Sequence, residues 1–212
     1  MKMSEVTDVE VKQEGKVINY NPVFPVMTAS IELDLPVEAM ASDMLKLAGD
    51  RTNHVSGFTT ATESIHLDQF QGVSQLKEAI YGIACSFGRE MKFEVNYDKC
   101  SIAVWANVMR KGNYTLPHGH KRTIFSGMFF ATAPSNAGAV AILNPTNIYR
   151  DHEPLVAPND TTAFTADSFA ILPSLNSLSM WPSWLQYCVP EIKSEDPLVC
   201  FFFTVDFLPP GA

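Results

Sequence analysis

The stretch that decides the fold runs from Trp105 to Phe130 and reads WANVMRKGNYTLPHGHKRTIFSGMFF. Two histidines, His118 and His120, stand two residues apart in it, between two strand-like segments. Residues i and i+2 of a strand point to the same face, so the sequence predicts that both imidazoles reach one metal ion. A pair of solvated loop histidines is the alternative interpretation.

Short apolar segments surround this stretch. Ile102 to Ala106 alternates in the manner of a strand, and further strands are expected at 125–131, 139–143, 168–172, 178–181 and 199–207. Gly, Pro, Asn and Asp separate them, with no helical pattern between, which predicts a sandwich or barrel. Phe201-Phe202-Phe203 places aromatic rings on both faces of the last strand, so both faces are expected to be covered.

The N-terminal half has a different pattern. In chain order the sequence predicts a flexible or partner-ordered arm (1–16), a strand with turns (18–33), a helix (36–49), a loop with a short ordered stretch at 65–70 (50–71) and a second helix (73–92). The whole is interpreted as one domain over 17–212, in which a helical and mixed part (17–98) packs on a β core (99–212).

Composition limits the classes of partner. Of 212 residues 46% are hydrophobic, and 15 basic against 23 acidic side chains give a net charge of −8. An acidic protein is a poor partner for nucleic acid or an anionic membrane. No apolar run reaches the roughly 18 residues of a membrane helix, and the polar start is not expected to act as a signal peptide. The four cysteines show no CxxC spacing and are interpreted as buried free thiols in a reducing compartment.

Two signatures in the chain resemble a known family. The first comprises Trp105, Asn107, Gly112, His118, His120, Ser126-Gly127, Phe129-Phe130, Pro134, Gly138 and Asn144-Pro145, and the second is WPSWLQYCVP at 181–190. Both are similar to 2-oxoglutarate/Fe(II) oxygenases common in marine bacteria and their phages, over about residues 20–208. The resemblance implies a mainly β fold with N-terminal helices, namely a double-stranded β-helix, a jelly-roll or cupin-like barrel.

The resemblance also implies a chemistry. Such a family holds iron with two histidines and a carboxylate or similar set, and a basic residue anchors the oxoglutarate carboxylate. His118, His120 and Tyr187 are thus the candidate metal ligands, and Asn107 and Lys193 the candidate oxoglutarate contacts. Tyr187 stands where the family has a histidine, and Asp196 to Cys200 lacks the expected arginine. Tyrosine, with a pKa of about 10, is a poor ligand for Fe(II).

Two functions follow from the resemblance. One is an oxygenase-like domain with an incomplete metal site, retained as a structural or assembly protein of a phage particle, with protein partners or as a homo-oligomer, in the cytoplasm or virion. The other is an active dioxygenase that uses Fe(II) and 2-oxoglutarate on an unknown substrate. A structural metal ion held by the two histidines is a third interpretation. His152 is either a replacement ligand or a solvated loop residue.

Other features have plainer interpretations. His54 and His66 are expected on the surface, and Trp181 and Trp184 in the core or an interface. A cupin is the alternative family, because Gly112 and the histidine pair match the start of its metal motif, but its glutamate and its downstream histidine element are missing.

Overall fold

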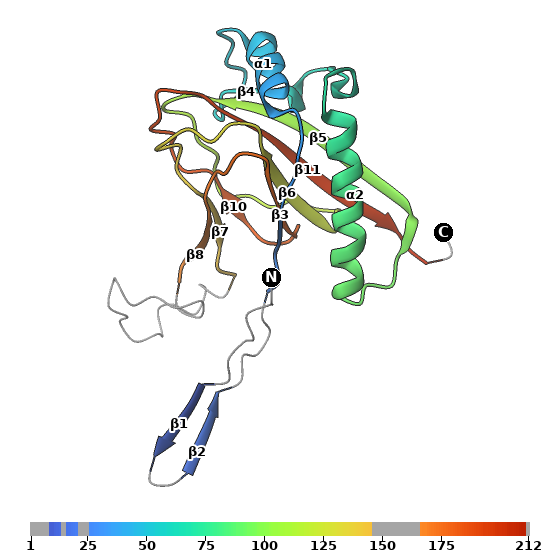
Figure 1. Cartoon of the computed structure of the whole chain (residues 1–212), viewed down its shortest axis with the longest axis vertical. Helices are drawn as coiled ribbons and strands as arrows, with labels where there is room; N and C mark the ends of the chain where they lie inside the picture. Colours follow the sequence, from blue (N-terminus) through green and yellow to red (C-terminus); the bar gives the residue numbers. More distant parts are fainter. Residues whose placement is uncertain (1–8, 14–15, 21–25, 146–165, 211–212) are drawn as a thin grey trace.

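The computed structural model describes residues 9–13, 16–20, 26–145 and 166–210 (Figure 1). Strands β1 (Val9–Gln13) and β2 (Lys16–Tyr20) pair in an antiparallel hairpin. This hairpin crosses the boundary predicted at residue 16, so part of the expected arm forms a β-strand. Flexibility of that arm stays a prediction, and residues 21–25 of the predicted strand lie outside the described residues.

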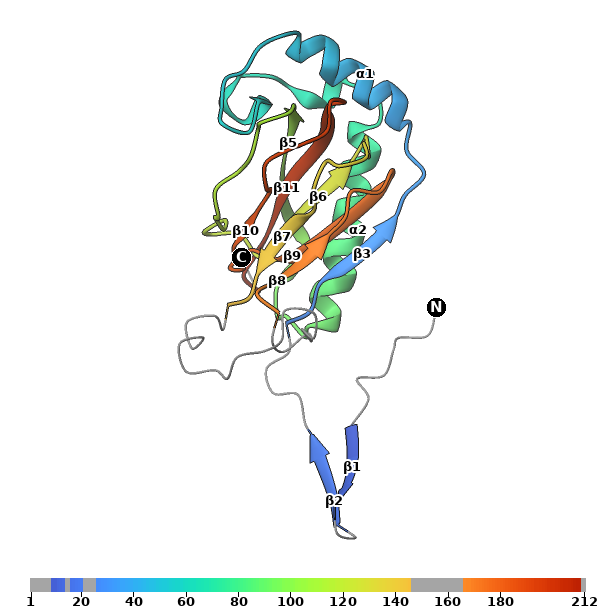
Figure 2. The same cartoon turned by 90° about the vertical axis from the view of Figure 1, so that its left-hand side faces the viewer.

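Two further sheets make up the β core, and every strand pair in them is antiparallel. The larger sheet has the strand order β3 (Ala29–Glu32), β9 (Ser177–Pro182), β6 (Phe125–Phe130), β11 (Leu198–Leu208), β5 (Asn96–Met109) and β4 (Phe58–Thr59). The smaller sheet has the order β10 (Tyr187–Cys188), β7 (Val140–Leu143) and β8 (Ser168–Ile171). Figure 2 shows β3, β9, β6 and β11 as neighbouring diagonal strands.

Two helices cover one face of the larger sheet. Helix α1 (Val37–Ala48) and helix α2 (Val73–Glu90) bury apolar stripes against it. Figure 1 shows α2 along one side of that sheet and β7, β8 and β10 on the other. Short 3-10 helices at η1 (Thr60–Thr62) and η2 (Leu67–Gln69) order the segment between the helices, which the sequence predicts to be mostly loop.

Strand β11 shows how the layers form. Phe201 and Phe203 belong to the apolar cluster on the helix side, whereas Phe202 belongs to the cluster beneath the smaller sheet. Successive side chains of a strand point to opposite faces, so the Phe-Phe-Phe run contributes to both cores. The prediction that this strand is covered on both sides is confirmed.

Most predicted elements are present with shifted ends. Strand β5 begins six residues before Ile102, at Asn96, and α2 ends at Glu90 rather than Lys92. Trp181 is buried in the core, whereas Trp184 is 61% exposed, so of the two predicted locations only an interface stays a prediction for Trp184. All four cysteines are free, and only Cys85 and Cys200 are buried. In the described part of the chain, no helix has the length and apolarity to cross a bilayer.

Candidate functional site

The histidine pair lies in the loop between β5 and β6. His118 forms an isolated antiparallel bridge with Tyr187, in which each backbone N–H donates to the other's carbonyl at 3.0 and 2.9 Å. His120 lies outside any strand. The prediction that the pair shares one strand face is therefore wrong. Pro117 has no N–H to extend a ladder, and Gly119 favours a turn over a strand.

The two imidazoles nevertheless lie close together, with ring centroids 5.3 Å apart. His118 Nδ1 donates to the carbonyl of Leu116 at 2.7 Å, which leaves its Nε2 as the acceptor nitrogen. His120 Nε2 lies 3.0 Å from the hydroxyl of Tyr187. The structure therefore brings together all three residues that the sequence proposes as metal ligands.

Tyr187 is a buried neutral phenol. Its ring is 1% exposed, and its centroid lies 4.5 Å from that of His118 and 5.0 Å from that of Trp181. Burial, and secondarily the Cys200 thiol, raises the pKa of the Tyr187 hydroxyl far above its ordinary value. The phenol therefore keeps its proton at physiological pH and can donate it in a hydrogen bond.

His120 is the natural acceptor of that hydrogen bond. Burial, and secondarily the neighbouring His118, lowers the pKa of the His120 imidazole below its ordinary value, so the ring is held neutral. In the tautomer with its proton on Nδ1, His120 Nε2 accepts the phenol O–H. The lone pair that would bind a metal is then engaged by Tyr187.

A pocket of about 400 Å³ opens beside the three side chains. Its walls come from the loop after α1, from β5, from the loop before β6 and from β10 and β11. The lining residues are His54, Val55, Ser56, Thr59, Ala61, Thr62, Trp105, Asn107, Thr115, Leu116, His118, His120, Tyr187 and Phe202. Among the described residues no acidic residue, lysine or arginine lines it, so the polarity of this lining comes from hydroxyl, amide and imidazole groups.

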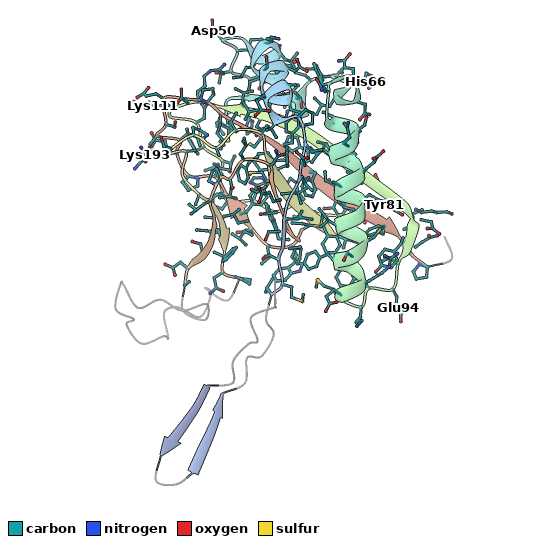
Figure 3. The ribbon with its side chains drawn as sticks, viewed as in Figure 1. Asp50, His66, Tyr81, Glu94, Lys111 and Lys193 are labelled. Atoms are coloured by element: carbon teal, nitrogen blue, oxygen red, sulfur yellow. The ribbon has the colours of Figure 1, made fainter. Side chains whose placement is uncertain are left out.

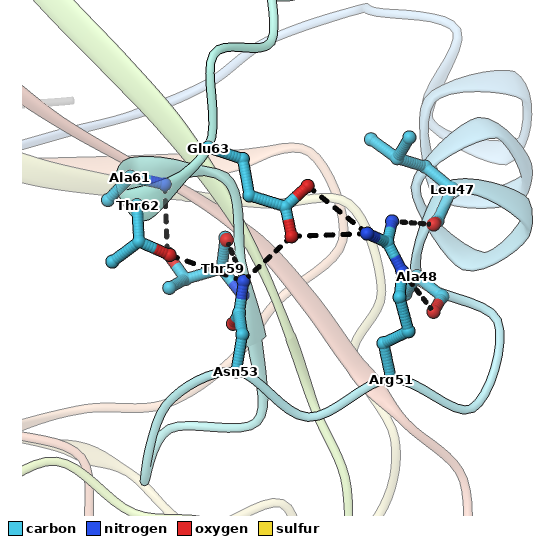
Figure 4. Close-up of polar contacts among 8 residues, drawn as sticks. All are labelled: Leu47, Ala48, Arg51, Asn53, Thr59, Ala61, Thr62 and Glu63. Carbon is cyan, nitrogen blue, oxygen red and sulfur yellow. Dashed lines mark hydrogen bonds and ion pairs between the residues drawn. The ribbon is translucent and has the colours of Figure 1, made fainter.

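The wall that carries His54 is fixed by a polar network (Figure 4). Arg51 pairs with Glu63 at 3.1 Å and donates to the backbone of α1, while Asn53 Nδ2 donates to Glu63 at 3.0 Å. Gly57 in this wall has a φ of +98°, and an added Cβ would lie 2.4 Å from the carbonyl of Val108. Only glycine lets this loop approach β5 so closely.

His54 is exposed, as the sequence predicts, yet it belongs to the pocket wall. Its Nδ1 accepts from the Ser56 hydroxyl at 2.9 Å, and Ser56 in turn lies 3.5 Å from Asn107 Nδ2. Sequence reasoning missed this wall, because a polar segment about 60 residues from the histidine pair carries no local signal of contact with it. His66 is exposed and lies outside the pocket lining.

The two proposed oxoglutarate contacts differ in position. Asn107 lies in the pocket wall, 4% exposed, and its buried Oδ1 has no hydrogen-bond partner among the described residues. Lys193 is exposed at the outer edge of the molecule and is not part of the pocket lining (Figure 3). The structure thus brings Asn107 to the site but not Lys193. His152 lies outside the described residues.

The described residues do not fit an iron and oxoglutarate site. No group of three His, Cys, Asp or Glu side chains among them is arranged to hold a metal ion. No lysine or arginine is buried in the described part of the chain, so an anchor for a buried carboxylate is missing there. The barrel interior next to Tyr187 is instead filled by apolar side chains, including Leu198, Cys200 and Phe202.

A match to a protein family covers the candidate site. Residues 103–204 match the family described as "Putative 2OG-Fe(II) oxygenase", a segment that contains His118, His120 and Tyr187. The chain carries a 2OG-Fe(II) oxygenase-like domain. No curated protein matches it in sequence.

Several solved structures have a fold similar to that of this chain. A prolyl-4-hydroxylase from Pseudomonas putida aligns with a TM-score of 0.58 at 10% identity, over 88% of this chain and 94% of that one. A prolyl hydroxylase from Trichoplax adhaerens gives 0.53 at 9% identity, over 85% and 83%. EvdO2 from Micromonospora carbonacea var. aurantiaca gives 0.52 at 11% identity, over 88% and 89%. The predicted double-stranded β-helix is confirmed.

The lowered pKa of His120 predicts how stability depends on pH. Between the unfolded pKa of about 6.5 and the lower folded value, the unfolded chain binds more protons than the folded one. We therefore expect the free energy of unfolding to fall as pH drops below about 6.5. Chemical denaturation at several pH values measures this.

The His120→Gln variant is the control, because its amide oxygen still accepts from Tyr187 but does not titrate. Its free energy of unfolding should vary less between pH 7.5 and 5.5 than that of the wild type, because the two proteins differ only at residue 120. Identical slopes for both proteins would mean that His120 titrates normally in the folded chain.

Proposed function

We propose that this oxygenase-like domain does not carry out oxoglutarate chemistry and serves as a structural or assembly protein. The observation that carries the proposal is the neutral Tyr187 phenol in hydrogen-bond contact with His120 Nε2. In this position a protonated phenol offers no anionic ligand and engages a nitrogen that a metal ion would need. The lack of a buried cation among the described residues supports the same conclusion for oxoglutarate.

Exposed apolar side chains support a role in protein contacts. Val55, Tyr114 and Leu116 are 48%, 41% and 65% exposed, and Val55 and Leu116 line the rim of the pocket. Exposed apolar groups of this size next to a cavity are typical of interaction surfaces. The partner in this proposal is a protein or a second copy of the chain. A phage particle is the assembly that we propose, because the family that the sequence resembles also occurs in phages.

The alternative is an active Fe(II)- and 2-oxoglutarate-dependent dioxygenase. It is favoured by the proximity of the two histidine rings and by the adjoining pocket of about 400 Å³. In that case His118 and His120 hold the metal, and the phenol of Tyr187 must turn away from His120 Nε2. When bound, iron would supply the oxidising chemistry, and the pocket would hold the substrate.

Metal content and oxoglutarate consumption separate the two functions. Wild type and His118→Ala are reconstituted anaerobically with Fe(II), desalted and assayed for iron and for succinate formed from oxoglutarate in air. We expect both proteins to retain far less than one equivalent of iron and to form no succinate above background. Iron near one equivalent and succinate formation that both depend on His118 would establish the dioxygenase and overturn the proposal.

A further inference from the structure

A second and larger pocket, of about 870 Å³, is lined in part by the loop that carries His120. Three segments line it: residues 92–95 after α2, residues 119–124 before β6, and the end of β9 with the loop that follows it, which contributes Pro182, Ser183, Trp184 and Gln186. Figure 3 labels Glu94, which belongs to the first wall, beyond the end of α2. The two pockets share His120 but otherwise have different linings.

We call this cavity the basic pocket, because Lys92, Lys121 and Arg122 line it. Its walls are held in place by internal contacts. Phe93 stacks on Phe125 at 5.8 Å, and its N–H donates to the carbonyl of Gly88 at 2.9 Å. Ser183 donates its N–H to the carbonyl of Ile124 at 2.9 Å and accepts from the Thr123 hydroxyl at 2.8 Å. A pocket whose walls are already ordered loses little entropy when a ligand binds.

The charge of the basic pocket is opposite to that of the chain. Lys92, Lys121 and Arg122 line it against the single carboxylate of Glu94, although the chain carries a net charge of −8. None of the three cations forms a salt bridge with a described residue. All three are exposed, so their charges are free to meet an anionic ligand.

Two of these cations occupy an unfavourable backbone conformation. Lys92 has a φ of +58° and Arg122 a φ of +64°. The other two non-glycine residues with positive φ among those described are asparagines, which tolerate this region far better. Long basic side chains thus stand at two turns where glycine or asparagine would be more stable, as is common where a side chain serves binding.

An aromatic platform completes the basic pocket. Trp184 lines it and is 61% exposed, whereas Trp181 of the same segment is fully buried. An exposed indole face next to a guanidinium and two ammonium groups can stack on a flat ring while the cations bind its anionic substituent. An extended nucleic acid would lie mostly over the acidic remainder of the surface, whereas a compact anion within the pocket would lie next to the three cations.

We propose that the basic pocket binds a small anion that carries a planar aromatic ring, the chemistry of a mononucleotide. Trp184 stacks on the ring, and Arg122, Lys92 and Lys121 bind the phosphate groups. The proposal rests on other residues than those that decide between the two proposed functions, so it can succeed or fail independently of them.

Isothermal titration calorimetry on the full chain tests the ring and the charge separately. The probes are adenosine 5′-diphosphate, adenosine and inorganic pyrophosphate. We expect the diphosphate to bind, and adenosine and pyrophosphate each to bind at least about tenfold more weakly, because each lacks one of the two contacts. Absence of binding by the diphosphate at millimolar concentration would overturn the proposal, as would equal binding of pyrophosphate.

Three variants locate the binding. Arg122→Gly removes the cation and suits the positive φ, so we expect weaker binding by about tenfold with an unchanged or higher melting temperature. Trp184→Ala removes the exposed ring and should weaken binding by a similar factor. Lys46→Ala, an equal charge change at an exposed position of α1, is the matched control. Diphosphate binding that Arg122→Gly and Trp184→Ala leave unchanged would place the ligand elsewhere and overturn the proposal.

Discussion

The Gly127→Ala variant is expected to lose about 3 kcal/mol or more of its free energy of unfolding. Gly127 lies in the middle of β6, between β9 and β11, opposite Phe203. An added Cβ would lie 2.2 Å from the tip of the Phe203 ring and 2.4 Å from the carbonyl oxygen of Ser179. Phe203 is fully buried, so its ring cannot move aside without disturbing the core on the helix side.

Equilibrium denaturation measures this loss, and Gly82→Ala is the matched control. Gly82 lies in α2 with nothing within 4 Å of an added Cβ, so the same substitution should raise the free energy of unfolding by up to about 1 kcal/mol. If Gly127→Ala remained within about 1 kcal/mol of the wild type, Phe203 would not lie over Gly127, and the packing of β6 on β11 would be wrong.

The β core is largely predictable from the sequence, because its buried strands are apolar on both faces. Strands β6 and β11 are almost entirely buried, and their runs of Phe, Met and Val predict this directly. The start of β5 is not predictable, since its residues around Asp98 are exposed and polar and pair only through the distant end of β11. Strand β10 has two residues, and only its pairing with β7 defines it.

The sequence predicts which residues make up the site but not how they contact one another. The resemblance predicts His118, His120 and Tyr187 as candidate metal ligands, and the structure places these three residues in contact. Their relation is not predictable, because the hydrogen bond from Tyr187 to His120 joins residues 67 positions apart. Burial of the phenol, which keeps it protonated, also depends on Trp181 and Phe202 from two other strands.

The relation of Tyr187 to the histidines leads to a second prediction, that a single change creates a metal site. Tyr187→His removes the phenol O–H from His120 Nε2 and supplies a third imidazole beside the pair. Three histidines that converge on one point bind Zn²⁺ or Co²⁺, with water in the fourth position. We expect the affinity for Co²⁺ to rise by about 100-fold or more over the wild type, because a ligand added to the metal itself contributes at least as much as the outer-shell partners whose loss costs about 10–100-fold. The visible absorption of bound Co²⁺ measures it.

Two controls determine whether the third imidazole is responsible. Tyr187→Phe also frees His120 Nε2 but adds no ligand, so its affinity for Co²⁺ should stay near that of the wild type. His118→Ala in the Tyr187→His background should remove the gain. If Tyr187→Phe bound Co²⁺ as well as Tyr187→His, the hydrogen bond would be the main obstacle, and the wild-type pair would be a latent metal site. If Tyr187→His bound no metal, position 187 would not face the point on which His118 and His120 converge, and the interpretation of Tyr187 as standing in a ligand position would be wrong.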